Sequence, residues 1–169
     1  MKKNLTLTGM MGVGKSTIGR TLSKRLSMQF IDIDKVIEKK LKLTIQKIFE
    51  KKGEPFFRKF EEIITLQELK KEKAIISLGG GAFMNSRIRN FVLLNSKSFW
   101  LDLNLKHLEE RLIKSKKRPL LNTNDIKKTL EVIYLKRIKT YALANYKIDC
   151  NKLNSDLIVS KIIEYYENK

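Results

Sequence analysis

The feature of this sequence that most constrains its fold is a glycine-punctuated turn near the N-terminus. Residues 9–16 read Gly-Met-Met-Gly-Val-Gly-Lys-Ser and match the pattern G-x-x-x-x-G-K-[ST] at every fixed position. The glycines allow successive backbone N–H groups to converge on phosphate oxygens at the N-terminus of a helix. Lys15 can reach the β- and γ-phosphates of a nucleotide, and the Ser16 hydroxyl can ligate Mg²⁺. We therefore predict an ATP site with Mg²⁺ as cofactor, formed by Gly12, Val13, Gly14, Lys15, Ser16 and Thr17.

The residues around this turn predict alternating strands and helices. An apolar strand at 4–8 enters the turn, and Ile18, Leu22 and Leu26 follow it at helical spacing. Further strands are predicted at 30–33, 74–78, 99–103 and 147–150, and further helices at 36–41, 45–49, 57–69, 85–94, 105–113 and 125–144, with a last helix ending near residue 167.

This alternation is typical of an α/β fold with a parallel sheet. We predict a single domain, residues 1–169, with a three-layer P-loop NTPase fold. Its parallel sheet should have about five strands, the usual size, with helices on both faces. The basic segment 114–124, which Pro119 interrupts, is predicted to be a mobile lid.

Charge raises an alternative class of function. The chain has 36 Lys and Arg residues against 18 Asp and Glu residues, a formal net charge of +18. A field of this size could attract nucleic acid, and an ATPase that binds nucleic acid is therefore an alternative. The basic residues, however, are mostly lysine, are spread over the whole chain and form no arginine-rich stripe. We interpret the charge as mainly compositional and expect no nucleic-acid partner.

The counts of cysteine and histidine and the hydropathy pattern exclude several other classes of protein. The chain has one cysteine, Cys150, and one histidine, His107, so an intrachain disulfide is excluded and a zinc site is not expected. Cys150 should be buried near a strand end, and His107 should lie on the surface. No stretch is apolar for long enough to be a signal peptide or a membrane span. We expect a cytoplasmic monomer that contacts no membrane.

Polar residues and glycines follow two of the predicted strands. Asp32 and Asp34 would share one face of a strand, although Asp34 could instead cap the helix predicted at 36–41. The strand at 74–78 ends without an acidic residue and continues into three glycines, 79–81. Glycines at the carboxyl end of a strand allow a ligand to approach the backbone closely.

Taken together, the motifs resemble those of the shikimate kinase family. They occur in the family's order and spacing, from the phosphate loop almost to the C-terminus. They are GMMGVGKST (9–17), DID (32–34), FR with a glutamate three residues after the arginine (57–61), GGG (79–81), RPLL (118–121), and Arg137 followed by Tyr141. The resemblance implies transfer of the γ-phosphoryl group of Mg²⁺–ATP to the 3-hydroxyl of shikimate, giving 3-phosphoshikimate and ADP on the route to chorismate and the aromatic amino acids.

The resemblance also implies roles for residues at the acceptor end, in a substrate segment of about 32–61. Asp32 would lie near the Mg²⁺, and Asp34 would bind substrate hydroxyls and act as the base for the attacking one. Arg58 and Arg137 would bind the substrate carboxylate, because a guanidinium fork matches two oxygens. The alternative for Arg58 is a surface ion pair with Glu61 or Glu62 at helical spacing. Gly80 and Gly81 would present their backbone to the substrate.

Two further arginines complete the implied site. Arg118, in the predicted lid, would stabilise charge on the transferred phosphoryl group, and Arg111 would stack on adenine. Phe49 and Phe57 either wall the substrate ring or belong to the core. Residues 151–155 lack the family's usual arginine and proline, so no adenine contact is assigned there.

The sequence departs from the family's pattern between the two aspartates, and some of its motifs also fit other functions. Ile33 stands where the family often has Thr, with little expected effect. Another enzyme class that fits is a P-loop kinase for gluconate or another sugar acid, which the arginine pair and the glycine triplet argue against. A module that binds ATP as a sensor and has no activity is a further possibility. The presence of the candidate catalytic residues Lys15, Asp34 and Arg118 argues against it.

Overall fold

The computed structural model describes residues 3–115 and 126–168. Within these ranges one sheet holds five strands, β1 (Asn4–Thr8), β2 (Gln29–Asp32), β3 (Ala74–Ser77), β4 (Ser96–Asp102) and β5 (Tyr146–Asp149). All pairings are parallel, in the order β2-β3-β1-β4-β5. The helices of the same ranges are α1 (Lys15–Leu26), α2 (Ile33–Leu41), α3 (Ile45–Leu69), the short 3₁₀ helix η1 (Ala82–Met84), α4 (Ser86–Asn95), α5 (Leu105–Ser115), α6 (Ile126–Tyr141) and α7 (Ser155–Glu167).

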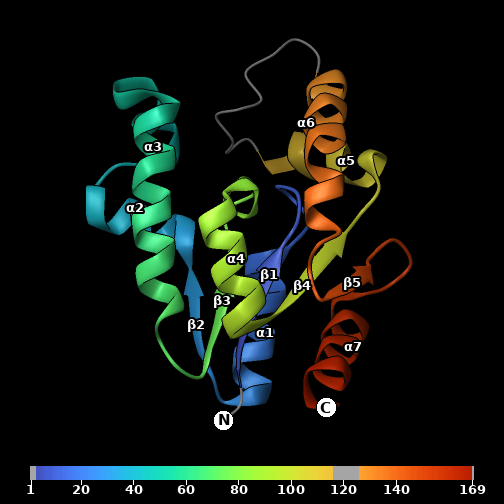
Figure 1. Cartoon of the computed structure of the whole chain (residues 1–169). Helices are drawn as coiled ribbons and strands as arrows, with labels where there is room; N and C mark the ends of the chain where they lie inside the picture. The colour runs from blue at the N-terminus through green and yellow to red at the C-terminus, as the bar shows by residue number, and fades with distance from the viewer. Residues whose placement is uncertain (1–2, 116–125, 169) are drawn as a thin grey trace.

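The sheet forms the middle of three layers, as predicted. In Figure 1, α4 lies in front of the sheet and α1 lies behind it, so helices cover both faces, as a parallel sheet requires. Helix α1 packs against α7, and α3 packs against α4. After β1 the chain runs to β2 and β3 on one side and then to β4 and β5 on the other. Ligands bind open α/β sheets at such a reversal, outside the carboxyl ends of the strands.

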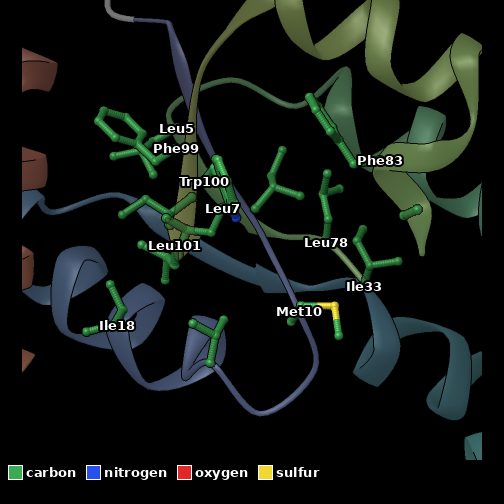
Figure 2. Close-up of a cluster of buried hydrophobic side chains, with 14 of the residues drawn as sticks. Leu5, Leu7, Met10, Ile18, Ile33, Leu78, Phe83, Phe99, Trp100 and Leu101 are labelled. Carbon is green, nitrogen blue, oxygen red and sulfur yellow. The ribbon is translucent and has the colours of Figure 1, made fainter. Parts of the chain in front are cut away.

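The core anchors the glycine-rich turn to the sheet. Leu5 and Leu7 of β1 and Phe99 of β4 are fully buried. Met10, from the turn itself, belongs to the same buried cluster as Leu78 at the end of β3 (Figure 2). The turn is therefore held at the carboxyl edge of the sheet by a side chain in the core.

The boundary between β2 and α2 differs from the prediction. The strand ends at Asp32, and Ile33 begins α2 instead of ending the strand. The Asp32 carboxylate accepts a hydrogen bond from the Lys35 N–H at 3.3 Å, so Asp32 caps this helix and Asp34 lies in its first turn. The alternative that Asp34 caps a helix is therefore wrong, and so is the premise that both aspartates lie on one strand. An aspartate at an N-cap satisfies an otherwise unpaired N–H of the first turn, which favours starting the helix earlier.

Two other segments bear on the predictions. The segment labelled α3 consists of two helical parts that meet at a kink at Gly53, whose angles are non-helical (φ 78°, ψ 166°), as the interrupted apolar pattern predicted. The predicted lid, 114–124, lies outside the described residues from residue 116 onward, and its first two residues belong to α5. None of the helices in the described ranges has the length and apolar character needed to cross a bilayer.

Candidate active site

The glycine-rich turn carries Lys15 to the start of α1. The ammonium of Lys15 donates hydrogen bonds to the carbonyl oxygens of Gly9, at 2.8 Å, and Met10, at 3.0 Å. Gly14 occupies the N-cap of α1 and has no side chain that could occupy the N–H groups of the first turn. These N–H groups and the Lys15 charge together make an anion site at the helix N-terminus.

Ser16 and Asp32 form a pair of oxygen donors beside this turn. The Ser16 hydroxyl donates to Oδ2 of Asp32 at 2.5 Å, which joins the start of α1 to the end of β2. Hydroxyl and carboxylate oxygens are the hard ligands that Mg²⁺ prefers, and Mg²⁺ usually keeps several waters and substrate phosphate oxygens as its other ligands. The donor pair therefore fits a magnesium ion that is shared with a nucleotide phosphate.

The glycine triplet after β3 is closely surrounded by polar side chains. A Cβ on Gly79 would lie 2.5 Å from Oε1 of Glu61 and 2.9 Å from Oδ1 of Asp34. A Cβ on Gly81 would lie 2.6 Å from Nη1 of Arg58. Side chains at these positions would displace the carboxylates and the guanidinium, so the absence of Cβ atoms is what allows this arrangement.

Gly80, in the middle of the triplet, is held from helix α6. Nη1 of Arg137 donates to the Gly80 carbonyl oxygen at 3.1 Å, and the Tyr141 hydroxyl donates to the same oxygen at 2.5 Å. The structure thus brings together, around three consecutive glycines, the three side chains that the sequence selected: Asp34 from α2, Arg58 from α3 and Arg137 from α6.

Two glutamates of α3 fix the Arg58 guanidinium. Nη1 donates to Glu61 at 2.7 Å, while Nε and Nη2 both donate to Oε1 of Glu54 at 3.1 Å. The predicted ion pair with Glu61 exists, but it lies inside the site, because Glu61 is only 2% exposed. Glu62 instead pairs with Arg87, at 2.6 Å.

Glu61 lies in the site, although the sequence alone predicts no role for it there. Its Oε1 has no hydrogen-bond partner among the described residues, although its Oε2 is paired with Arg58. Burial raises the pKa of the Glu61 carboxyl, and the Arg58 charge opposes that rise. Glu61 belongs to the motif at 57–61, but its spacing of three residues from Arg58 fits an exposed helix pair equally well and gives the glutamate no role of its own.

The aromatic residues near Arg58 belong mainly to the core. Phe49 and Phe57 have ring centroids 4.7 Å apart, and Phe57 is 3% exposed. The Arg58 guanidinium lies over the Phe57 ring, 5.1 Å from its centroid. Core packing therefore accounts for Phe57, whose ring also supports the arginine.

A cavity lies beside Arg111 of α5, a side chain that also contacts the phosphate loop. Nη1 of Arg111 donates to the Val13 carbonyl oxygen at 3.0 Å, which places α5 against the loop. Arg111 also borders a cavity of about 300 Å³ that is lined by Leu103, His107, Glu110, Arg111, Lys114, Cys150, Asn151 and Leu153. The cavity thus includes Cys150, buried as predicted, and part of the segment 151–155 that the sequence left without a role. Burial raises the pKa of the Cys150 thiol to about 12, so the thiol stays protonated and unreactive.

Arg118 cannot be located relative to these groups because it lies outside the described residues. Among the described residues, the phosphate loop follows β1 and the glycine triplet with its surrounding polar side chains follows β3, so the two groups meet at the carboxyl ends of these strands. The distance between Gly80 and the phosphate loop is short, since a Cβ on Gly80 would lie 3.4 Å from the Met11 backbone nitrogen. Such an arrangement can hold a phosphate donor and an anionic acceptor side by side.

The family model and the similar proteins and structures agree on one family. The family model for shikimate kinase matches residues 11–167. A shikimate kinase of Bartonella henselae is 38% identical over 159 residues, which cover 94% of this chain and 76% of that protein. The structure of shikimate kinase from Acinetobacter baumannii in complex with shikimate has a TM-score of 0.93 and 31% identity, covering 99% of this chain and 96% of that one. A gluconokinase from Sinorhizobium meliloti shares only the fold, with a TM-score of 0.60 and 12% identity.

Proposed function

The chain belongs to the shikimate kinase family and is an ATP-dependent kinase, and we propose that it transfers the γ-phosphoryl group of Mg²⁺–ATP to the 3-hydroxyl of shikimate at the site described above. The observation that carries this proposal is the meeting of Asp34, Arg58 and Arg137 around the glycine triplet, next to the phosphate loop. Two arginines and a carboxylate suit an acceptor that has both a carboxylate and hydroxyl groups.

In this proposal the nucleotide phosphates lie over the turn formed by residues 9–17. Backbone N–H groups of Gly12, Val13, Gly14 and Thr17 bind phosphate oxygens, and Lys15 leaves its carbonyl partners to contact the β- and γ-phosphates. Ser16 and Asp32 would hold the Mg²⁺, which neutralises charge on the phosphates. The adenine would occupy the cavity beside Arg111, whose planar guanidinium can stack on the base.

The acceptor would lie between the glycine triplet and three side chains. Arg58 and Arg137 bind its carboxylate, and Asp34 accepts a hydrogen bond from the 3-hydroxyl. Gly80 and Gly81 present backbone atoms to the ring substituents. Glu54 and Glu61 hold Arg58 in one orientation, which lowers the entropy lost when the substrate binds.

The transfer step follows from this placement. The 3-oxygen attacks the γ-phosphorus in line, its proton passes to the Asp34 carboxylate, and the bond from the γ-phosphorus to the bridging oxygen breaks to release ADP. Lys15 stabilises the charge on the transferring group and on ADP. We assign Arg118, in the predicted lid, to the same charge, as the motif resemblance implies.

A substrate panel tests the proposal. ADP release from Mg²⁺–ATP should be stimulated strongly by shikimate and weakly or not at all by quinate and gluconate, because the arginine pair and Asp34 match one arrangement of carboxylate and hydroxyls. Equal stimulation by gluconate would favour the sugar-acid kinase. No stimulation by any of these acids, in protein that still binds ATP, would contradict the acceptor assignment.

Arg137→Ala separates the two substrates. Removing the guanidinium should raise the KM for shikimate by about 100-fold, because one half of a charge-assisted contact is lost, and should leave ATP binding nearly unchanged. Arg137→Lys should have an intermediate effect, since it keeps the charge and loses the fork. Lys136→Ala, an exposed neighbour on α6, is the matched control. Equal losses for both ligands in Arg137→Ala would argue against a carboxylate contact.

A further inference from the structure

We propose that Tyr141 is a positioning residue that holds the Gly80 peptide between the acceptor site and the phosphate loop. The proposal rests on the function proposed above for the identity of the acceptor. Tyr141 is fully buried at the C-terminal end of α6, and its hydroxyl donates to the Gly80 carbonyl oxygen at 2.5 Å. That carbonyl also accepts a hydrogen bond from Arg137 at 3.1 Å.

Two donors on one carbonyl oxygen fix the orientation of the peptide. The peptide between Gly80 and Gly81 is planar and trans, so holding its carbonyl also fixes the direction of the Gly81 N–H. Glycine has no side chain to restrict its backbone, so in this triplet the restriction has to come from outside. Tyr141 and Arg137 provide it from residues four apart on one helix, the spacing that places two side chains on the same face.

Tyr141 also reaches the phosphate loop. Its hydroxyl oxygen lies 4.0 Å from Sδ of Met10, and its ring is stacked on Trp100 of β4 with centroids 6.1 Å apart. A Cβ on Gly80 would lie 3.4 Å from the Met11 nitrogen and 3.9 Å from the Gly9 carbonyl oxygen. The Gly80 peptide is therefore confined by the phosphate loop as well as by α6.

The hydroxyl remains a donor over the working range of pH. Burial raises the pKa of the Tyr141 phenol, and the nearby Arg137 charge acts in the opposite direction. A neutral phenol donates one hydrogen bond, and the Gly80 carbonyl takes it. Loss of that donor would leave Arg137 as the one remaining side-chain partner of this oxygen among the described residues, and Arg137 is also needed by the acceptor carboxylate.

Tyr141→Phe tests the role because it removes the hydroxyl alone. We expect the KM for shikimate to rise about tenfold, the loss of one good hydrogen bond, with the Kd for ATP changed less than twofold. Tyr166→Phe is the matched control, since the buried Tyr166 donates to the Lys3 carbonyl oxygen at 2.6 Å at the amino edge of the sheet. Thermal unfolding of both variants is measured first, and kinetics are compared at a temperature where both are folded.

The double variant Tyr141→Phe/Arg137→Ala adds a test that does not depend on changes in stability, namely how the two effects on the KM for shikimate combine. Because both side chains act on one carbonyl, their effects on the KM for shikimate should combine to less than the product of the single effects. An unchanged KM in Tyr141→Phe, or a fully multiplicative double variant, overturns the inference. A wild-type protein without shikimate-dependent turnover would overturn the proposed function, and this inference with it, before any variant is compared.

Discussion

Lys15→Ala should lower kcat by about 10³-fold, the effect of removing a preorganised group that stabilises charge in the transition state. Lys15 is the cation that the glycine-rich turn places at the N-terminus of α1, where it rests on the Gly9 and Met10 carbonyl oxygens at 2.8 and 3.0 Å. In the proposed complex it moves from these carbonyls to the β- and γ-phosphates. The measurement is the rate of ADP release at saturating ATP and shikimate.

The control for this variant is Lys24→Ala, which removes an exposed lysine from the last turn of the same helix and should leave kcat within twofold of the wild type. Thermal unfolding shows whether Lys15→Ala is folded, since the buried ammonium also binds the turn. A folded Lys15→Ala protein that retains more than a tenth of the wild-type kcat would refute the assignment of Lys15.

Asp34→Asn should lower kcat by about 10²- to 10⁴-fold, the contribution of a positioned general base, while the KM for shikimate changes much less. Asparagine has nearly the same shape and still forms hydrogen bonds, but it cannot take the proton of the attacking hydroxyl. The side chain stays beside Gly79, where Oδ1 of Asp34 lies 2.9 Å from the position of a Cβ. Steady-state kinetics with shikimate as the varied substrate give both constants.

Asp156→Asn is the matched control for the base. Asp156 is exposed on α7 and pairs with Arg25, so its loss should leave both kinetic constants unchanged. An Asp34→Asn variant with the wild-type kcat would mean that solvent accepts the proton and that Asp34 only positions the acceptor.

The sequence predicted the sheet and most helices because apolar runs in a parallel sheet are buried on both faces and stand out from their surroundings. It failed where polar residues are buried. Strand β4 begins at Ser96, three residues before its predicted start, because the Ser96 and Ser98 hydroxyls are hydrogen-bonded inside the protein to Thr6 and Asn145. A Ser-Lys-Ser sequence indicates a loop unless such partners are known.

Some residues of the candidate site could be predicted from the sequence, and others could not. Motif spacing selected Asp34, Arg58 and Arg137, and folding brings all three to the glycine triplet. Glu61 and Tyr141 were given no role in the site, because their importance depends on what lies opposite them: Glu61 faces Gly79, and Tyr141 faces the Gly80 carbonyl. Helical spacing gives the face of a helix that a residue occupies, but not the loop that packs against that face.

The cavity beside Arg111 could not be predicted for a similar reason. Its lining comes from the ends of β4 and β5 and from α5, which are distant in the sequence. Cys150 and Asn151 lie there because β5 pairs with β4 in register, Asp149 opposite Asp102. A single sequence does not state which strands are neighbours, so residues that follow two different strands cannot be assigned to one cavity.

The proposed phosphoryl transfer to the 3-hydroxyl is tested by identifying the product with ³¹P and ¹H NMR after incubation with Mg²⁺–ATP and shikimate. We expect one phosphomonoester per ADP, with the phosphorus coupled to the ring proton on carbon 3, because in the proposed complex Asp34 and the phosphate loop present that oxygen to the γ-phosphorus. Inorganic phosphate formed at the same rate with and without shikimate, or a phosphate on another hydroxyl, would contradict the proposed transfer.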